Sequence, residues 1–174
     1  TLPLNLLTPE QYLAAERKAD HRSEYYNGEV FAMAGGSRQH VVICKNLTWR
    51  LSVQLDGKPC EVYPLEMLVR VNPGRDYLYT YPDLSVVCGE PEWEDGHFDT
   101  LVNPKVIIEV LSPSTEPFDR GKKFALYRQI PALAEYLLVW QDQPRIEHYV
   151  RQSDGKWLLS EAAGLDAVIE LSSV

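Results

Sequence analysis

Two acidic residues lie beside apolar runs that are typical of buried strands. Asp83 precedes the run Leu84–Cys88, and Glu109 interrupts the run Val106–Leu111. An ionised carboxylate inside an apolar strand carries a large desolvation cost unless it is paired or bound to a metal. If the two strands are neighbours, the carboxylates converge and repel each other, and a divalent cation relieves that repulsion. Because all-oxygen ligation favours Mg²⁺ or Mn²⁺ over zinc, the sequence predicts such an ion at Asp83 and Glu109.

A basic residue follows on a helix that we expect over Asp119–Ile130. Asp119, Lys123 and Tyr127 are spaced by four residues and therefore share one face of this helix, whereas Lys122 is turned about 100° away. A lysine beside a carboxylate–metal pair can position or help to deprotonate an attacking water, or stabilise charge on a phosphate. The Tyr127 hydroxyl could bond to Lys123, a carboxylate or the substrate, or its ring could serve for packing alone.

Each of these residues also has a purely structural interpretation. Asp83 could cap a turn, because it follows a proline. Glu109 could pair with Arg70 or Lys105, and Lys123 could be an ordinary solvated helix residue. The chemical interpretation rests on the acids and the lysine occurring together.

The first part of the chain predicts two helices and a hairpin. Thr8–Gln11 matches a capping box with proline at the first helical position, and we expect its helix to reach Asp20 and to bury Tyr12, Leu13 and Ala15. Asn27-Gly28 between two strand-like runs is typical of a hairpin turn. Ser37 is expected to cap a second helix. One face of that helix carries His40, Cys44, Leu47, Leu51 and Leu55.

The rest of the chain is mainly strand-like. The expected strands are Cys60–Pro64, Leu65–Val71, Leu84–Cys88, Val106–Leu111, Glu135–Trp140, Ile146–Gln152 and Trp157–Glu161. We expect the first two of these to pair with each other. The pattern predicts an α/β (mixed α+β) fold in which helices flank a central mixed β-sheet, with residues 1–174 forming a single domain.

Composition and charge limit the classes of function. The chain has 174 residues, 45% of them hydrophobic, and a net charge of −8, which disfavours a protein that coats nucleic acid through bulk electrostatics. Much of the acidity lies in residues 90–99, expected to be an exposed, mobile loop, whereas residues 120–128 are basic. No apolar run is long enough to span a membrane, and Thr1–Asn5 lacks the features of a signal peptide, so we expect a cytoplasmic protein.

The three cysteines are odd in number and widely separated. Cys44, Cys60 and Cys88 show no CxxC spacing that would indicate a zinc site. We therefore expect buried free thiols, which behave as small apolar side chains.

Four stretches of the sequence resemble the Uma-type family of restriction-endonuclease-like proteins, which is abundant in cyanobacteria and belongs to the PD-(D/E)xK nuclease superfamily. The similarity spans about Thr8 to Val150. It is carried by RSEYYNGEVFAMAGGSRQH, YPDLSVV, VIIEVLSPST and DRGKKFALYRQIPALAEYLLV. The resemblance implies a restriction-endonuclease-like core.

The resemblance also implies roles for the residues singled out above. The superfamily's two metal-binding acids correspond to Asp83 and Glu109. Two positions after Glu109, where the superfamily expects lysine, this chain has Leu111. Uma-type proteins resemble one another in placing that lysine on the following helix, which corresponds here to Lys123, with Tyr127 after it.

Further residues enter through the same resemblance. Glu24 and His40 match family positions and are implied to orient a metal or a water, and Val110 is expected to lend its carbonyl oxygen to the metal. Without the resemblance, Glu24 could pair with Arg22 or Arg38, and His40 could be a core histidine.

Three functions remain open at this point. The first is a Mg²⁺- or Mn²⁺-dependent endonuclease that hydrolyses DNA phosphodiester bonds, and a homodimer would suit cleavage of two strands. The second is a non-catalytic binding or assembly module that retains a structural ion site, which the acidity and the lack of a DNA-reading motif favour. The third is a small-molecule enzyme that uses Glu109 and Lys123 for proton transfer.

Overall fold

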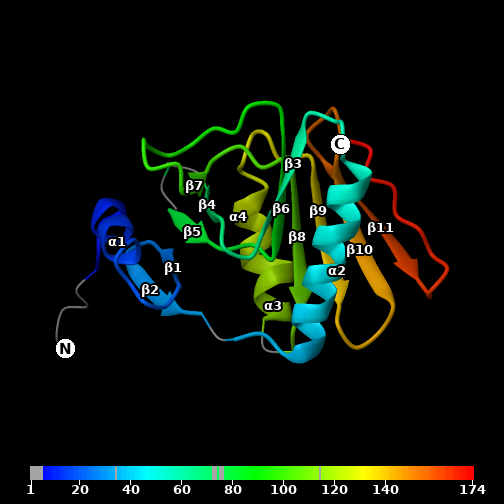
Figure 1. The fold of residues 1–174 in the computed structure, drawn as a ribbon, viewed down its shortest axis with the longest axis horizontal. Coiled ribbons are helices and arrows are strands. Elements are labelled where there is room, and N and C mark those ends of the chain that lie inside the picture. Colours follow the sequence, from blue (N-terminus) through cyan, green and yellow to red (C-terminus); the bar gives the residue numbers. More distant parts are fainter. Residues whose placement is uncertain (1–5, 34, 72–73, 75–76, 114) are drawn as a thin grey trace.

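A computed structural model describes residues 6–33, 35–71, 74, 77–113 and 115–174 of the chain (Figure 1). Thr1–Asn5, on which the expectation about a signal peptide rests, lie outside the described residues. None of the helices in the described part is long and apolar enough to cross a membrane.

The helices and strands follow one another along the chain with a long run of strands between α2 and α3. They are α1 (Pro9–Glu16), β1 (Ser23–Tyr26), β2 (Glu29–Ala32), α2 (Arg38–Gln54), β3 (Cys60–Pro64), β4 (Leu68–Val71), β5 (Leu78–Thr80), β6 (Leu84–Cys88), β7 (Thr100–Leu101), β8 (Val106–Leu111), α3 (Glu116–Phe118), a π-helical turn (Asp119–Lys123), α4 (Phe124–Tyr127), β9 (Glu135–Trp140), β10 (Arg145–Arg151) and β11 (Trp157–Ala163). The segment α3–π turn–α4 is continuous, and we call it the Glu116–Tyr127 helix.

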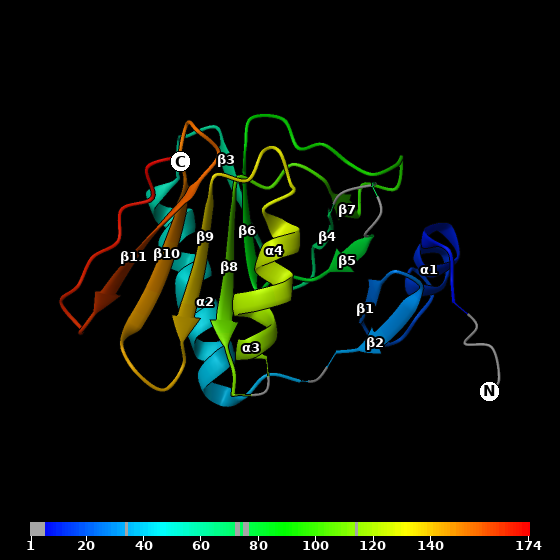
Figure 2. The same cartoon turned by 180° about the vertical axis from the view of Figure 1, so that it is seen from behind.

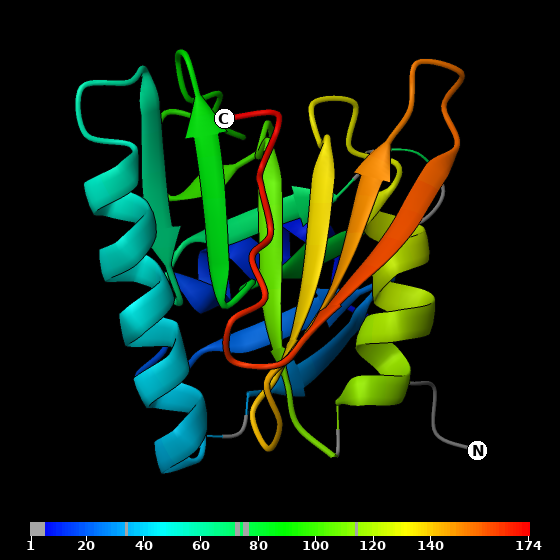
Figure 3. The ribbon, with the colours of Figure 1, turned by 90° about the vertical axis from the view of Figure 1, so that its right-hand side faces the viewer.

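The larger sheet has six strands in the order β11-β10-β9-β8-β6-β3. β8 and β9 run parallel, and the other neighbouring pairs are antiparallel. Side chains alternate between the faces, so Ile108 and Val110 of β8 pack with residues of α2, whereas Ile107 and Leu111 pack with the Glu116–Tyr127 helix. Figure 3 shows these strands side by side, with the C-terminal segment crossing in front of β8.

The smaller sheet has five strands in the order β2-β1-β5-β4-β7. One of its faces joins the core of the Glu116–Tyr127 helix, which therefore lies between the two sheets. The other face packs on α1 through Tyr12, Tyr25 and Tyr79. Figure 2 shows the resulting order of layers, with α1 and the β1–β2 hairpin at the far side of the molecule from α2. The mixed α/β architecture predicted from the sequence is thus confirmed.

The expected turn and caps form, with one correction at the first helix. Thr8 and Gln11 make both bonds of the capping box, and Asn27 and Gly28 adopt positive φ angles of 47° and 98° in the hairpin turn. The first helix ends at Glu16, not at Asp20. The expectation that Ala15 is buried is wrong, because Glu16 turns inward instead.

Glu16 is stabilised in its buried position by three hydrogen bonds. Its carboxylate accepts bonds from the backbone and hydroxyl of Ser23 and from the hydroxyl of Tyr81. This network closes α1 onto the strands that follow, and it explains why the helix stops there.

The predicted pairing of Leu65–Val71 with Cys60–Pro64 is wrong. β3 pairs with β6, whereas the next strand begins only at Leu68 and joins the smaller sheet beside β5 and β7. The chain crosses from one sheet to the other at residues 65–67. A short turn between strands usually indicates a hairpin, but here the burial of Val69 and Val71 in the core between the sheets decides the partner.

The expectation of three free thiols is also wrong. Cys60 and Cys88 face each other in the β3–β6 register, with Cα atoms 4.0 Å apart, and form a disulfide. Cys44 is the buried free thiol. The antiparallel pairing brings Cys60 and Cys88 together, which their separation of 28 residues does not reveal. Disulfides are rare in reducing compartments, so this bond does not support the cytoplasmic location expected from the sequence.

The acidic loop 90–99 is held by ion pairs and is not simply a solvated surface. Arg17 of α1 bonds to Asp95 and Asp99, and Arg70 of β4 bonds to Glu94. These contacts attach the loop to the smaller sheet and α1.

Candidate metal centre

The antiparallel pairing of β6 with β8 brings the two acids to one place. Leu84 lies opposite Ile108 in the register, so Asp83, one residue before, and Glu109, one residue after, stand across from each other where β6 begins. Both side chains are buried, at 8% and 4% exposure. The two strands are thus neighbours, which is the condition under which we expected the two carboxylates to approach each other.

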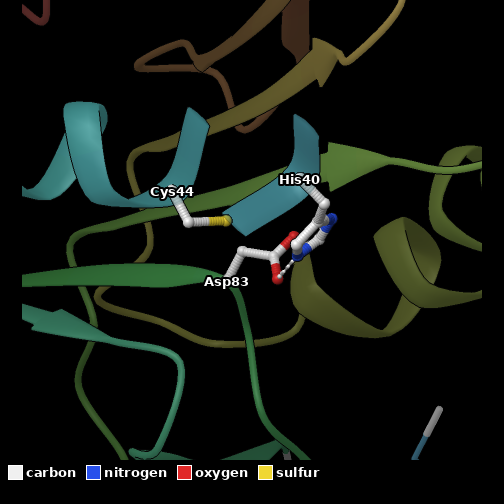
Figure 4. Close-up of side chains that lie close together, drawn as sticks. All are labelled: His40, Cys44 and Asp83. Carbon is white, nitrogen blue, oxygen red and sulfur yellow. Dashed lines mark hydrogen bonds and ion pairs between the residues drawn. The ribbon is translucent and has the colours of Figure 1, made fainter. Parts of the chain in front are cut away.

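Asp83 is fixed through both of its carboxylate oxygens. Oδ2 accepts a hydrogen bond of 2.7 Å from the backbone N–H of Val110, and Oδ1 lies 2.9 Å from Nε2 of His40 (Figure 4). The contact of Val110 with Asp83 uses its N–H group, and the role predicted for its carbonyl stays a prediction. His40 reaches Asp83 because it lies in the first turn of α2, which Ser37 caps by accepting a bond from the His40 N–H.

Glu109 points to the opposite side, towards the Glu116–Tyr127 helix. Its Oε1 lies 2.9 Å from Nζ of Lys123 and accepts a hydrogen bond of 2.7 Å from the hydroxyl of Tyr127. Lys123 and Tyr127 are both buried, so the pair and its tyrosine are shielded from water. A carboxylate that looks out of place on an apolar strand thus has its partners on the facing helix.

Lys123 is surrounded by further carboxylates. Its Nζ lies 3.5 Å from Glu24 of β1 and 3.7 Å from Asp119, in addition to Glu109. Glu24 is positioned by the hydroxyl of Thr80, which donates a hydrogen bond to it. Lys123 and Asp119 are the two ends of the π-helical turn, a feature that is frequent at functional sites.

Burial and charge act together on the pKa values of this cluster. Burial raises the pKa of the Glu109 carboxyl, and the neighbouring Lys123 opposes part of that rise. Burial acts to lower the pKa of Lys123, but the carboxylates of Glu109, Glu24 and Asp119 outweigh it and raise that pKa well above its usual range. The lysine is therefore charged, and the acids around it exceed it in number.

A cavity of about 940 Å³ opens onto these residues. Among the described residues, its wall holds six acidic side chains and two that can carry positive charge, Lys123 and His40. The acids are Glu24, Asp83, Glu109, Glu116, Asp119 and Asp142. A cavity with this excess of carboxylates attracts cations and, by itself, repels phosphates.

The ion pairs decide between several structural alternatives for the site residues. Arg70 pairs with Glu94, so it is not the partner of Glu109. Glu24 pairs with Lys123, whereas Arg22 contacts Glu66. Lys122 is exposed and stands 3.8 Å from the ring centre of Tyr26, as expected for the lysine that is turned away from the site.

Two residues of the cluster, Asp119 and Cys44, have no chemical role among the predictions from the sequence. Asp119 lies four residues before Lys123, which predicts that both share one helical face, and this spacing is the signal for its presence in the site. Cys44 lies one helical turn after His40, and its side chain points to Asp83 and His40 (Figure 4). Its position on an apolar helical face indicated only a core residue.

The ion pair between His40 and Asp83 predicts a pH-dependent contribution to stability. The hydrogen bond to Asp83 raises the pKa of His40 from 6.5 to about 10, and Cys44 adds to the rise. A raised histidine pKa stabilises the fold fully below the unfolded value and loses that effect as pH rises through the folded value. The difference in unfolding free energy between the wild type and His40→Gln should therefore shrink between pH 6.5 and about 10. Urea unfolding in EDTA measures it, and a constant difference would contradict the ion pair.

Comparisons with known proteins agree on one family. Residues 9–174 match the Uma2 family, described as "Putative restriction endonuclease". Two Synechocystis proteins described as uncharacterized, sll1609 and slr1290, are each 38% identical to this chain. The alignments cover 96% and 99% of this chain and 93% and 88% of the relatives.

A solved structure supports the same fold. A crystal structure from Anabaena variabilis, described as a "putative nuclease belonging to DUF820", superposes with a TM-score of 0.75 at 18% identity over 96% of this chain and 90% of that chain. The chain therefore shares its fold with this crystal structure. The chain belongs to the Uma2 family of restriction-endonuclease-like proteins, as its resemblance predicted.

Proposed function

We propose that this protein is a divalent-metal-dependent endonuclease that hydrolyses phosphodiester bonds in DNA. The observation that carries the proposal is the meeting of Asp83, Glu109 and Lys123 in one cavity, reached from two strands and a helix. The family and the nuclease-like neighbour support a nucleic acid as the substrate.

The donor groups fit a hard divalent ion. Asp83 and Glu109 offer carboxylate oxygens, and the nearby Glu24 and Asp119 add negative charge that Lys123 alone does not balance. Mg²⁺ and Mn²⁺ prefer such oxygen ligands. Asp83 and Glu109 would hold the ion, with the Val110 carbonyl and His40 as further candidates. A bound ion supplies a water of lowered pKa and shields the charge of the phosphate.

The remaining side chains have positioning and electrostatic roles in this proposal. Lys123 is held by three carboxylates, so its ammonium group stays charged and in place beside Glu109, where it can orient a water or stabilise a phosphate oxygen. Tyr127 fixes the Glu109 carboxylate through its hydroxyl. Glu24 fixes Lys123 from the side of the β1–β2 hairpin.

A second candidate is a nuclease-fold module that binds an ion without cleaving DNA. The acidity of the cavity wall favours this candidate, because phosphates approach it only after the charge has been neutralised. Both candidates require a metal, and they differ in whether a phosphodiester bond is broken.

The experiment that tests the proposal combines cleavage with calorimetry. Supercoiled, linear duplex, branched and single-stranded DNA are incubated with the protein and Mg²⁺ or Mn²⁺, and we expect cleavage that EDTA abolishes. Metal binding is measured in parallel by titration calorimetry. Tight metal binding without cleavage of any of these substrates would overturn the proposal in favour of the module.

Two copies of the site would allow both strands of a duplex to be cut. We propose a homodimer for this reason, and light scattering after gel filtration tests it. A monomer that still cuts both strands would overturn the homodimer without affecting the nuclease proposal.

A further inference from the structure

The Cys44 thiol stands at the edge of the site and has no role in the proposed hydrolysis. It is buried, at 2% exposure, on the face of α2 that carries His40 one turn earlier. Its sulfur lies beside the imidazole of His40 and the carboxylate of Asp83 (Figure 4). A thiol, an imidazole and a carboxylate are the three kinds of side chain that zinc and related ions bind most often.

The three donor atoms are already close enough to share one ion. A nitrogen of His40, the sulfur of Cys44 and a carboxylate oxygen of Asp83 all lie within 4.8 Å of one another. Ligand atoms on a tetrahedral zinc lie roughly 3.5 Å apart, because the bonds are about 2.0–2.3 Å long. Small rotations of these side chains would therefore be enough to surround an ion.

One donor is held in place by a backbone hydrogen bond, and another has room because of a glycine. The Val110 N–H bonds to the Asp83 oxygen that does not face His40, at 2.7 Å. A hydrogen bond of this kind orients a ligand and raises its affinity for a metal. Gly36 leaves room for the imidazole, because a Cβ atom at this position would lie 2.8 Å from Cδ2 of His40.

The group also has an open side. His40 and Asp83 line the cavity, whereas Cys44 lies behind them. Water from the cavity can thus supply a fourth ligand, which three protein ligands leave open.

We propose that His40, Cys44 and Asp83 form a site for a thiophilic divalent ion of the Zn²⁺ class, distinct from the Mg²⁺ or Mn²⁺ site proposed at Asp83 and Glu109. The sulfur ligand gives this site a preference for Zn²⁺, Co²⁺ or Cd²⁺ over Mg²⁺. Asp83 belongs to both sites, so an ion bound at Cys44 takes this ligand from the other site. Zn²⁺ therefore inhibits Mg²⁺-dependent cleavage; this consequence rests on the proposed function.

Co²⁺ provides the test, because it replaces Zn²⁺ and absorbs light. We expect titration of the wild type with Co²⁺ to give a sulfur-to-cobalt charge-transfer band that Zn²⁺ abolishes at equimolar concentration, whereas Mg²⁺, which competes only through the shared Asp83, weakens it only in large excess. Cys44→Ser should lose this band. The matched control is Cys60→Ser/Cys88→Ser, which removes the other two cysteine sulfurs and should keep it. Circular dichroism shows that each variant is folded, and His40→Asn serves as a second ligand variant.

The outcomes separate this inference from the proposed function. Absence of the band from the wild type, or its persistence in Cys44→Ser and His40→Asn, would overturn the thiophilic site. Glu109→Gln should retain the band, because Glu109 is not one of the three ligands, and its loss there would make Glu109 a ligand of the same ion and overturn the separate site. A protein that shows the band but cleaves no DNA would refute only the nuclease proposal.

Discussion

Replacing Glu109 with Gln, or Asp83 with Asn, should lower metal-dependent DNA cleavage by about 100-fold or more, to the level seen without metal. Each change preserves the shape of the side chain but removes the negative charge that would hold the ion. Glu109→Gln can still accept the hydrogen bond of Tyr127, so the fold should persist. Initial rates on a DNA substrate and the Mg²⁺ affinity of each variant measure the effect.

Asp142→Asn is the matched control for this prediction. Asp142 lies in the wall of the same cavity but is exposed, so the substitution removes an equal charge without touching the buried pair. We expect its rate to stay close to that of the wild type. If either Asp83→Asn or Glu109→Gln cleaved as fast as Asp142→Asn, the assignment of the metal to these two acids would be wrong.

Lys123→Met should cost about 3–5 kcal/mol of unfolding free energy, as expected when one partner of a buried ion pair is removed. The variant keeps the length of the side chain but leaves Glu109, Glu24 and Asp119 without their shared cation. A divalent ion should restore part of the loss, because it binds the folded state and replaces the missing charge. Urea unfolding with and without Mg²⁺ measures both effects.

The neighbouring lysine gives the comparison. Lys122→Met removes an exposed cation whose contact is the ring of Tyr26, and such contacts contribute about 0.5–1 kcal/mol. A Lys123 variant no less stable than this one would show that the buried cluster does not depend on the lysine.

Much of the fold was predictable because its signals are local. Strands β3, β6, β8 and β9 have the expected bounds, since each is a mainly apolar run that ends where turn or polar residues follow. The partner of β4 was not predictable in this way. Its apolar side chains suit either sheet, and the choice depends on the core between the sheets, which no local pattern contains.

The residues of the site also differ in whether a local sequence signal indicates them. Asp83 and Glu109 were found because a carboxylate next to an apolar run is anomalous in itself. Lys123 was found through its helical spacing and the family resemblance. Cys44 looked like any other apolar-face residue, and its relation to Asp83 arises only when α2 packs on the larger sheet. Residues that join a site through packing alone leave little trace in the sequence.

The π-helical turn that ends at Lys123 has an evolutionary consequence. A π turn contains one residue more than an α-helical repeat, so it behaves as an insertion inside the Glu116–Tyr127 helix. Deleting a single residue such as Gly121 would restore regular α-helical bonding and leave the two ends of the helix on the faces they have now, because one π turn and one α turn each complete about one full turn. A one-codon event can thus remodel the turn that carries Lys123 and Asp119 while α3, α4, β6 and β8 stay untouched. Descendants of one gene can in this way alter the surroundings of the cation without rebuilding the fold.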